Sequence, residues 1–448
     1  MDMTRGEPRK LLILFAIPMI LGGIFQLLYN TVDTIVVGRF VSEDALAAIG
    51  ATSTSTLLIN VLGNSFTNAI TIITSQAEGA SLPKRIRQAL THSVYMVTAV
   101  GLILGLISFF GARPFMRFLG CDPTIIDLSV LYLRIVCGLT IFSLWYQGSS
   151  ALLRGIGDSK TPLYFLIFSS VLNVVLDLVF VLLLKQGVAG VGWATVISQA
   201  CAAALCGWLL HRNEPVFFAE SSASGGRARF GVDRGLLKRT LRFSYASALQ
   251  QAGIYVGKLL VQSMVNPLGV QAAAAFTAVN RIDDYALIPE RDIASGETVL
   301  VAQNHGARKF DRMQQGLRAA MVIEAAYGLI VSLAVFALAG PLMRLFVPST
   351  ETEVIRLGTR YLRLMGFFYF MPGITNGLQG YMRAMGKMNI TMYVTYSQMF
   401  IRAICTWLLI GRMQLDAVPL ACVAGWILML VWETGLIVHW KRTGKLYR

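Results

Sequence analysis

Apolar residues recur in long blocks along the whole chain, and polar residues gather in the short stretches between them. A helix spans a bilayer core with about 20 apolar residues, and most blocks are near this length. They lack the period-two alternation of β-strands, so each block predicts a transmembrane α-helix. Three blocks are much longer, and there we expect tilt or an internal break. The twelve predicted helices span residues 11–37, 44–76, 89–111, 128–153, 161–184, 188–210, 240–265, 271–302, 315–339, 354–382, 390–410 and 417–439.

The chain also contains an internal duplication, which appears when the sequence is shifted against itself. The matching stretches, at shifts of 227 and 229 residues, are 45–48 with 272–275, 76–80 with 303–307, 113–117 with 340–344, 132–135 with 361–364, and 154–157 with 383–386. Solenoid repeats are only about 20–50 residues long, so this period indicates two homologous half-proteins. In a very apolar chain, such a duplication is typical of secondary transporters whose binding site lies between the halves.

The organisation of the halves follows from the helix count. Each half has six predicted helices, an even number, so both enter the membrane in the same direction and form parallel repeats. A stretch of small residues at 220–226, inside a basic loop, predicts a flexible connection. We therefore expect an all-α membrane protein of two six-helix bundles that rock against each other. The predicted divisions are an N-terminal bundle at 1–210, a cytoplasmic linker at 211–239 and a C-terminal bundle at 240–448.

Composition and charge support this class and exclude others. Only 14% of the residues are charged, against about 25% in ordinary soluble domains. The net charge of +15 could suggest nucleic acid. Outside the predicted helices, however, 23 of the 39 Lys and Arg residues lie on the side that holds both termini and 6 on the other. Positive residues mark the cytoplasmic face, so we predict a multi-pass protein of the cell (inner) membrane with both termini cytoplasmic and no nucleic-acid partner.

Motifs of enzymes are missing from the chain. There is no Walker A sequence, no H-E-x-x-H and no G-x-S-x-G, and the four histidines are widely spaced. A clustered nucleophile, base or metal set would favour a membrane enzyme, and an added sensor domain would favour a receptor. The sequence shows neither, so we expect no enzymatic activity and no resident cofactor.

The most informative residues are carboxylates inside the predicted helices. A charge at mid-bilayer costs at least about 2.5–3.5 kcal/mol, so such residues are usually functional. In the first half, Asp33 and Asp177 lie well inside predicted helices. Their distances from the helix ends place both in the outer half of the membrane, at the same depth as Thr195. Asn173 precedes Asp177 by four residues and shares its helix face. Four polar side chains from three helices therefore share one layer.

This layer supports three interpretations. The carboxylate, amide and hydroxyl oxygens of Asp33, Asn173, Asp177 and Thr195 suit a hard cation such as Na⁺. A close pair of carboxyls in a site with restricted water would instead bind a proton. The third interpretation is a structural polar network between helices, which Asn and Thr side chains often form.

The second half does not repeat this acidic layer. Lys258 and Arg402 occupy comparable depth there, so one half is acidic where the other is basic. One interpretation is that these cations contribute to an anionic substrate site. The alternative is that Asp283, Asp284 or Glu324 neutralises them within the same half.

Other polar positions mark candidates for a water-lined cleft. The block 271–302 is so polar around Pro289 that it must be broken there or face a wet cavity. The candidate substrate-cleft residues are Gln26, Tyr29, Asn30, Gln251, Tyr255, Lys258 and Arg402.

Several ordered motifs resemble the MATE family, multidrug and toxic compound extrusion, which belongs to a superfamily that also holds lipid and oligosaccharide flippases. The resemblance covers nearly the whole chain, and no single motif carries it alone. The matching stretches are Ile17-Pro18, Tyr29 to Thr34, Val37 to Arg39, Ala45 to Ala48, Arg154 to Pro162, Asn173-x3-Asp177, Gly192 to Thr195, Asn280 to Asp283, and Ala302 to Ala307.

The resemblance implies a V-shaped, twelve-helix monomer that exports cationic or amphipathic small molecules in exchange for H⁺ or Na⁺. The family's N-lobe cation site maps onto Asp33, Asn173, Asp177 and Thr195. Some members also use a Glu on helix 7, for which Tyr245 and Gly253 stand here. Because that carboxylate is missing, we favour H⁺ as the coupling ion. The alternative function is a flippase or exporter of lipid-linked or anionic substrates.

Overall fold

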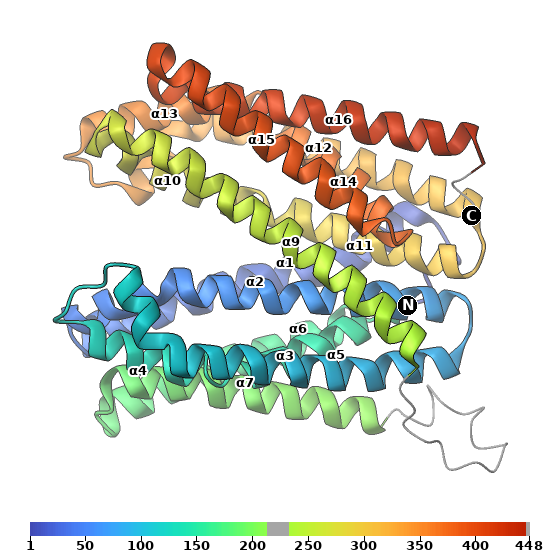
Figure 1. The fold of residues 1–448 in the computed structure, drawn as a ribbon, viewed down its shortest axis with the longest axis horizontal. Coiled ribbons are helices and arrows are strands. Elements are labelled where there is room, and N and C mark those ends of the chain that lie inside the picture. The colour runs from blue at the N-terminus through green and yellow to red at the C-terminus, as the bar shows by residue number, and fades with distance from the viewer. Residues whose placement is uncertain (213–232, 445–448) are drawn as a thin grey trace. The chain divides into compact units, whose positions relative to one another are not determined.

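The computed structural model of the chain describes residues 1–212 and 233–444, apart from the side chains of Asn30 and Thr54. These residues form helices joined by short turns, with no strand among them (Figure 1). Each of the twelve predicted blocks coincides with one helix or with two consecutive helices. By length and composition, seven helical stretches of the described chain could cross a membrane, and one bent pair would make an eighth.

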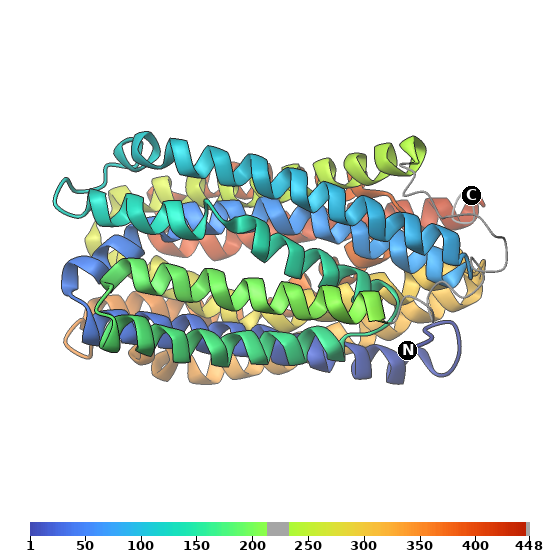
Figure 2. The same ribbon diagram turned by 90° about the horizontal axis from the view of Figure 1, so that it is seen from below.

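Residues 1–212, the described part of the first half, form seven α-helices. The fourth predicted block is two helices that bend by 41° at residues 137–139, a break that the block length did not indicate. The contacts and Figure 2 agree that α6 and α7 lie side by side. The helices are α1 (Pro8–Phe40), α2 (Glu43–Gly79), α3 (Pro83–Phe118), α4 (Ile126–Val136), α5 (Thr140–Gly155), α6 (Lys160–Leu178), which continues into a π-helical turn at Val179–Leu183, and α7 (Gly187–Arg212).

The second half repeats this order with one extra break. The block 271–302 is broken at Leu287, near Pro289 as predicted. Pro289 lies in the first turn of α11, where backbone N–H groups have no partner within the helix, so the missing N–H of proline costs nothing. The helices are α9 (Arg234–Val265), α10 (Val270–Ala286), α11 (Ile288–Gly306), α12 (Phe310–Phe346), α13 (Thr352–Gly366), α14 (Phe370–Ala384), α15 (Met388–Met413) and α16 (Ala417–Arg442), with 3₁₀ turns at Asn266–Leu268 and Gln414–Asp416.

Unusual backbone conformations recur at matching positions of the two halves. Ser81 has a φ of 51°, and Arg308, at the matching position of the second half, has a φ of 56°. The left-handed turn at Lys185 likewise recurs at Gln414, with φ values of 52° and 51°. Non-glycine residues rarely adopt this conformation, so its recurrence at matching positions supports a common origin of the two halves.

A close approach between two helices also recurs, once in each half. A Cβ atom on Gly101 of α3 would lie 2.8 Å from Ile141 Cα of α5. Gly328 of α12 stands at the matching position, where a Cβ atom would lie 2.5 Å from Phe370 Cα of α14. Only glycine leaves room for these approaches, which fix how α5 and α14 pack in their own halves.

The contacts divide the chain into two compact units. The first unit comprises Met1–Asp2 and Ile17–Ala248, and the second comprises Met3–Ala16 and Leu249–Arg448. Both α1 and α9 therefore change unit part-way along. The first turns of α1 were expected in the N-terminal bundle and group with the second unit instead, whereas most of the predicted linker, 213–232, lies outside the described residues. The predicted domain boundaries stay a prediction.

Hydrogen bonds hold the start of the chain within the second unit. The backbone N–H of Met3 donates to Gln303 Oε1 at 3.0 Å, and Asn304 Nδ2 donates to the Met3 carbonyl at 3.0 Å. Lys309 Nζ donates to the Thr4 carbonyl at 2.9 Å. These contacts explain why the residues before α1 and its first turns pack with α11 and α12.

Side-chain burial matches a protein surrounded by lipid. Large apolar side chains are exposed on the outer helices, for example Phe110 at 72% and Phe400 at 66%. Polar side chains are instead found inside, as with Asp177 at 0% and Glu324 at 0%. This inversion of the usual soluble pattern is what a bilayer environment favours.

Candidate functional site

The four predicted ion-site residues lie together in the first unit. Asp33 comes from α1, Asn173 and Asp177 come from α6, and Thr195 comes from α7. With the Asn173 amide in the orientation that satisfies its neighbours, its nitrogen donates to Asp33 Oδ1 at 2.8 Å and its oxygen accepts from the Thr195 backbone N–H at 3.2 Å. One amide therefore links all three helices.

Asp177 is the member of this group whose side chain lacks hydrogen-bond partners. Its side chain is fully buried, and neither carboxyl oxygen has a hydrogen-bond donor. Its charged neighbour is the carboxyl group of Asp33, which is only partly buried. Two ionised carboxylates are acceptors only, so they can share a hydrogen bond only if one is protonated. The arrangement therefore has room for a proton between the two groups.

Two tyrosines complete the surroundings. The phenol of Tyr29, a predicted cleft residue, hydrogen-bonds with Thr195 and lies near Asp33 and Asp177. Tyr132 of α4 also lies near both carboxyls, and the sequence analysis did not select it. The duplication could have indicated Tyr132, because it pairs this residue with a second tyrosine, Tyr361. In the structure, Tyr361 lies near Asp283 and Arg402 of the second unit.

The local sequence explains this placement. Asn173 and Asp177 are one helical turn apart, and both are buried with Ser169 on one face of α6. The π-helical turn begins two residues after Asp177, and such turns are frequent at functional sites. Beyond it, a buried apolar cluster separates the polar group from the loops at that end of the unit. The cluster consists of Val36, Val37, Ala45, Val181, Val188 and Val191.

The basic residues of the second unit are largely neutralised there. Lys258 Nζ donates to Asp284 Oδ1 at 3.0 Å, as the alternative interpretation predicted. Arg402 is 9% exposed and interacts electrostatically with Asp283, which accepts a hydrogen bond from the Tyr369 hydroxyl. The third predicted counter-ion, Glu324, lies elsewhere, among other buried glutamates.

The positions of the remaining cleft candidates do not show whether they line a substrate cleft. Gln26 is exposed on α1, and Gln251 and Tyr255 are partly buried on α9. The side chain of Asn30 lies outside the described part of the structure. Their role in a substrate cleft stays a prediction.

Four buried glutamates of the second unit were missed as site candidates. Glu290 and Glu297 lie on α11, Glu324 lies on α12 and Glu433 lies on α16, and each is 0% exposed. A sequence signal exists for them, because carboxylates inside apolar helices are costly and are usually functional.

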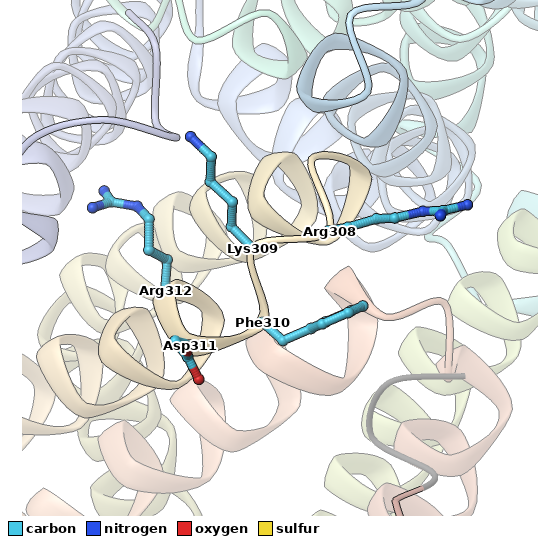
Figure 3. A pocket seen from close by; sticks show the side chains of 5 residues that line it. All are labelled: Arg308, Lys309, Phe310, Asp311 and Arg312. Atoms are coloured by element: carbon cyan, nitrogen blue, oxygen red, sulfur yellow. The ribbon is translucent and has the colours of Figure 1, made fainter.

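A pocket of about 430 Å³ lies at the turn between α11 and α12 (Figure 3). It is lined by Arg308, Lys309, Phe310, Asp311 and Arg312. Lys309 and Arg312 also donate to backbone carbonyls of residues 3–6. The pocket contains none of the predicted ion-site residues, so we do not assign the transport site to it.

Known proteins resemble this chain along most of its length. The probable multidrug resistance protein YoeA of Bacillus subtilis is 28% identical over 378 residues, which cover 83% of this chain and 80% of the relative. A Shewanella oneidensis protein named FAD transporter is 22% identical over 405 residues, covering 86% and 84%. A solved structure of a multidrug resistance MATE family transporter in an outward-facing conformation matches with a TM-score of 0.89 at 21% identity, covering 98% of both chains.

The family comparison agrees with the duplication and with the all-helical fold, which confirms the predicted fold class. The matching solved structure has the same fold over nearly the whole chain. The MatE family model matches twice, at residues 18–179 and 246–408, one match in each half. The chain therefore belongs to the MatE family of membrane transporters.

Proposed function

We propose that the protein exports cationic or amphipathic small molecules in exchange for H⁺, and that Asp33 and Asp177 bind the coupling proton. The observation that carries this proposal is the fully buried Asp177 carboxyl, which has no donor and has Asp33 as its neighbour. Protonation of one carboxyl creates the missing donor. Loss of that proton leaves two like charges in a poorly hydrated site, which favours rearrangement or entry of another cation.

The number of ligands that each ion needs favours H⁺ over Na⁺ in this proposal. Sodium would need the oxygens of Asn173 and Thr195 in addition to the two carboxylates. The Asn173 oxygen already accepts from the Thr195 N–H. The Thr195 hydroxyl donates to the Val191 carbonyl at 3.0 Å and hydrogen-bonds with Tyr29. These contacts leave lone pairs on both oxygens, so Na⁺ would need four ligands in one place, whereas a proton needs only the carboxyls.

An exporter or flippase of anionic substrates is the second candidate. The relative named FAD transporter and the buried Arg402 favour it. The ion pair of Lys258 with Asp284 argues against it, because a paired lysine offers little charge to an anion. For either function we propose a monomer in the cell (inner) membrane with both termini cytoplasmic.

Transport by purified protein in liposomes tests the proposal. One set of liposomes carries a pH gradient without sodium, and a second carries a sodium gradient at clamped pH. A fluorescent organic cation and an anionic flavin nucleotide serve as substrates. We expect transport of the cation in the first set alone. Movement driven only by sodium would overturn the choice of ion, and movement of the flavin nucleotide alone would favour the second candidate.

A further inference from the structure

Three glutamates lie inside the second unit without hydrogen-bond donors. Glu290 and Glu297 are on α11 and Glu324 is on α12, and all three are 0% exposed. None of their carboxyl oxygens has a hydrogen-bond partner. We call these three residues the acidic row. An isolated carboxylate in an apolar interior is strongly disfavoured, and such a group binds a proton instead.

Glycines of α14 provide the space for the acidic row. A Cβ atom on Gly373 would lie 3.3 Å from Glu324 Oε2 and 3.4 Å from Glu290 Cδ. A Cβ atom on Gly380 would lie 3.0 Å from Glu297 Oε2. Gly377 lies between these two glycines, and a Cβ atom there would lie 3.5 Å from Glu297 Oε2 and 3.9 Å from Glu324 Cγ. The three carboxyl side chains therefore lie along two turns of α14.

The first unit shows that packing does not need carboxyl groups at these positions. The 227-residue shift places Gly63, Ile70 and Val97 where the acidic row stands. There, Ile70 and Val97 belong to a buried apolar cluster with Leu144. Leu144 fills the space at Gly63, whereas the second unit has a glutamate on α11 and Gly373 on α14. The first unit has the glycine on α2 and the large side chain on α5, and the second unit has the large side chain on α11 and the glycine on α14. Only in the second unit is the large side chain acidic.

Neighbouring charged groups do not satisfy the acidic row. The groups that interact with it electrostatically are Arg291 of α11, Tyr327 of α12 and Arg383 of α14, and Glu433 of α16 lies beyond Arg383. Arg291 and Tyr327 donate to backbone carbonyls. Arg383 donates no hydrogen bond to Glu297. The α1 side chains that approach α11 are apolar.

We propose that the acidic row is a second proton-binding site, separate from Asp33 and Asp177. Each carboxyl takes one proton from water when the row is hydrated and returns it to water later, and no other bond forms or breaks. A metal ion is not the expected ligand, since the described residues contain no group of three or more His, Cys, Asp or Glu side chains that could hold one. The proposal does not depend on which ion drives export.

Infrared spectroscopy of the purified full chain tests this proposal. At neutral pH, exposed glutamates are ionised, so only buried neutral glutamates give the band of a protonated carboxyl. Isotope labelling of glutamate shifts this band and separates it from aspartate, which keeps the test distinct from that of Asp33 and Asp177. We expect a labelled protonated band that shrinks in Glu290→Gln, Glu297→Gln and Glu324→Gln. The exposed Glu351 supplies the matched control, Glu351→Gln, which should leave the band unchanged.

Proton counting adds a second measurement. After a rapid shift from neutral to alkaline pH, each Gln variant of the acidic row should release about one proton fewer per chain than the wild type. Thermal unfolding and gel filtration verify that the variants are folded. The labelled wild-type protein can overturn the proposal even if a variant misfolds. Because the buried Glu433 can contribute to its band, the assignment to the acidic row rests on the decrease in the variants. Absence of a protonated glutamate band in the wild type, or an unchanged band in all three variants, would overturn the assignment.

Discussion

The side-chain nitrogen of Asn173 donates to Asp33 Oδ1 at 2.8 Å, which joins α6 to α1 inside the first unit. Asp177 lies one turn further along α6 and is the second carboxyl of the pair. Under the proposed function, a proton that binds to either carboxyl would change how well Asp33 accepts this hydrogen bond. The neutral amide would then couple the position of α1 to the protonation of the pair.

The first prediction concerns Asp33→Asn. Asparagine keeps the shape of the side chain but cannot bind and release the coupling proton, so gradient-driven export should fall to a small residual rate. Folding should be preserved, because Asp33 is only partly buried. The measurements are efflux of a fluorescent cation and the thermal unfolding temperature. Near-normal export by a folded variant would remove Asp33 from the proposed pair.

The second prediction combines Asp33→Asn with Asp177→Asn. If both carboxyls hold one proton, the double variant should be hardly worse than the more impaired single variant. Effects of residues that act as a unit are non-additive, with coupling energies of about 0.5–3 kcal/mol. The measurement is the residual export rate of all four proteins, expressed as a double-mutant cycle. Strict additivity of two partial losses would place the carboxyls in separate sites.

The third prediction concerns Lys258→Met. The Lys258–Asp284 pair is partly exposed, with side-chain exposures of 37% and 55%, so its loss should change the unfolding free energy by at most about 1 kcal/mol. Export of a cationic substrate should remain within about twofold, because the lysine is already paired. Export assays with the single variant check this, and Asp284→Asn is the matched control. A large and selective loss of anionic transport would instead assign Lys258 to a substrate site.

The sequence was sufficient to predict the helices and the grouping of four polar residues in the first unit. Helix content followed from block length, and the grouping of Asp33, Asn173, Asp177 and Thr195 followed from depth and helix period. Both are local properties of an apolar chain in a bilayer, where an unsatisfied polar group is costly. The break inside the fourth block was not predictable in this way, because it depends on the close approach of Gly138 to the Arg134 carbonyl and to Phe109.

The second unit shows where sequence reasoning was incomplete. Asp284 was among three proposed counter-ions, and only the structure shows that Lys258 pairs with it while Glu324 lies near Glu290 and Glu297. Glu290 and Glu297 are two turns apart on α11, which the sequence does show, but their grouping with Glu324 of α12 around the glycines of α14 is visible only in the structure. Such a cluster depends on tertiary packing, which one-dimensional spacing does not determine.

The last prediction concerns the two helix approaches that the duplication preserves. Gly101→Ala places a methyl group 2.8 Å from Ile141 Cα, and Gly328→Ala places one 2.5 Å from Phe370 Cα. Backbone cannot yield as a flexible side chain can, so each variant should lose about 1–3 kcal/mol of stability. The matched control is Gly111→Ala on α3, where nothing lies within 4 Å of the added atom. That variant should be neutral or gain about 0.5–1 kcal/mol, since alanine is the better helix former.

Thermal unfolding of the three variants in lipid nanodiscs measures this difference. The two close approaches lie in different units and share no partner, so the losses in Gly101→Ala and Gly328→Ala should add in the double variant. Equal stability of all three single variants would show that the helices can separate at these points without cost. In that case, the glycines would not fix the packing of α5 and α14, and the space that α14 leaves for the acidic row would need another explanation.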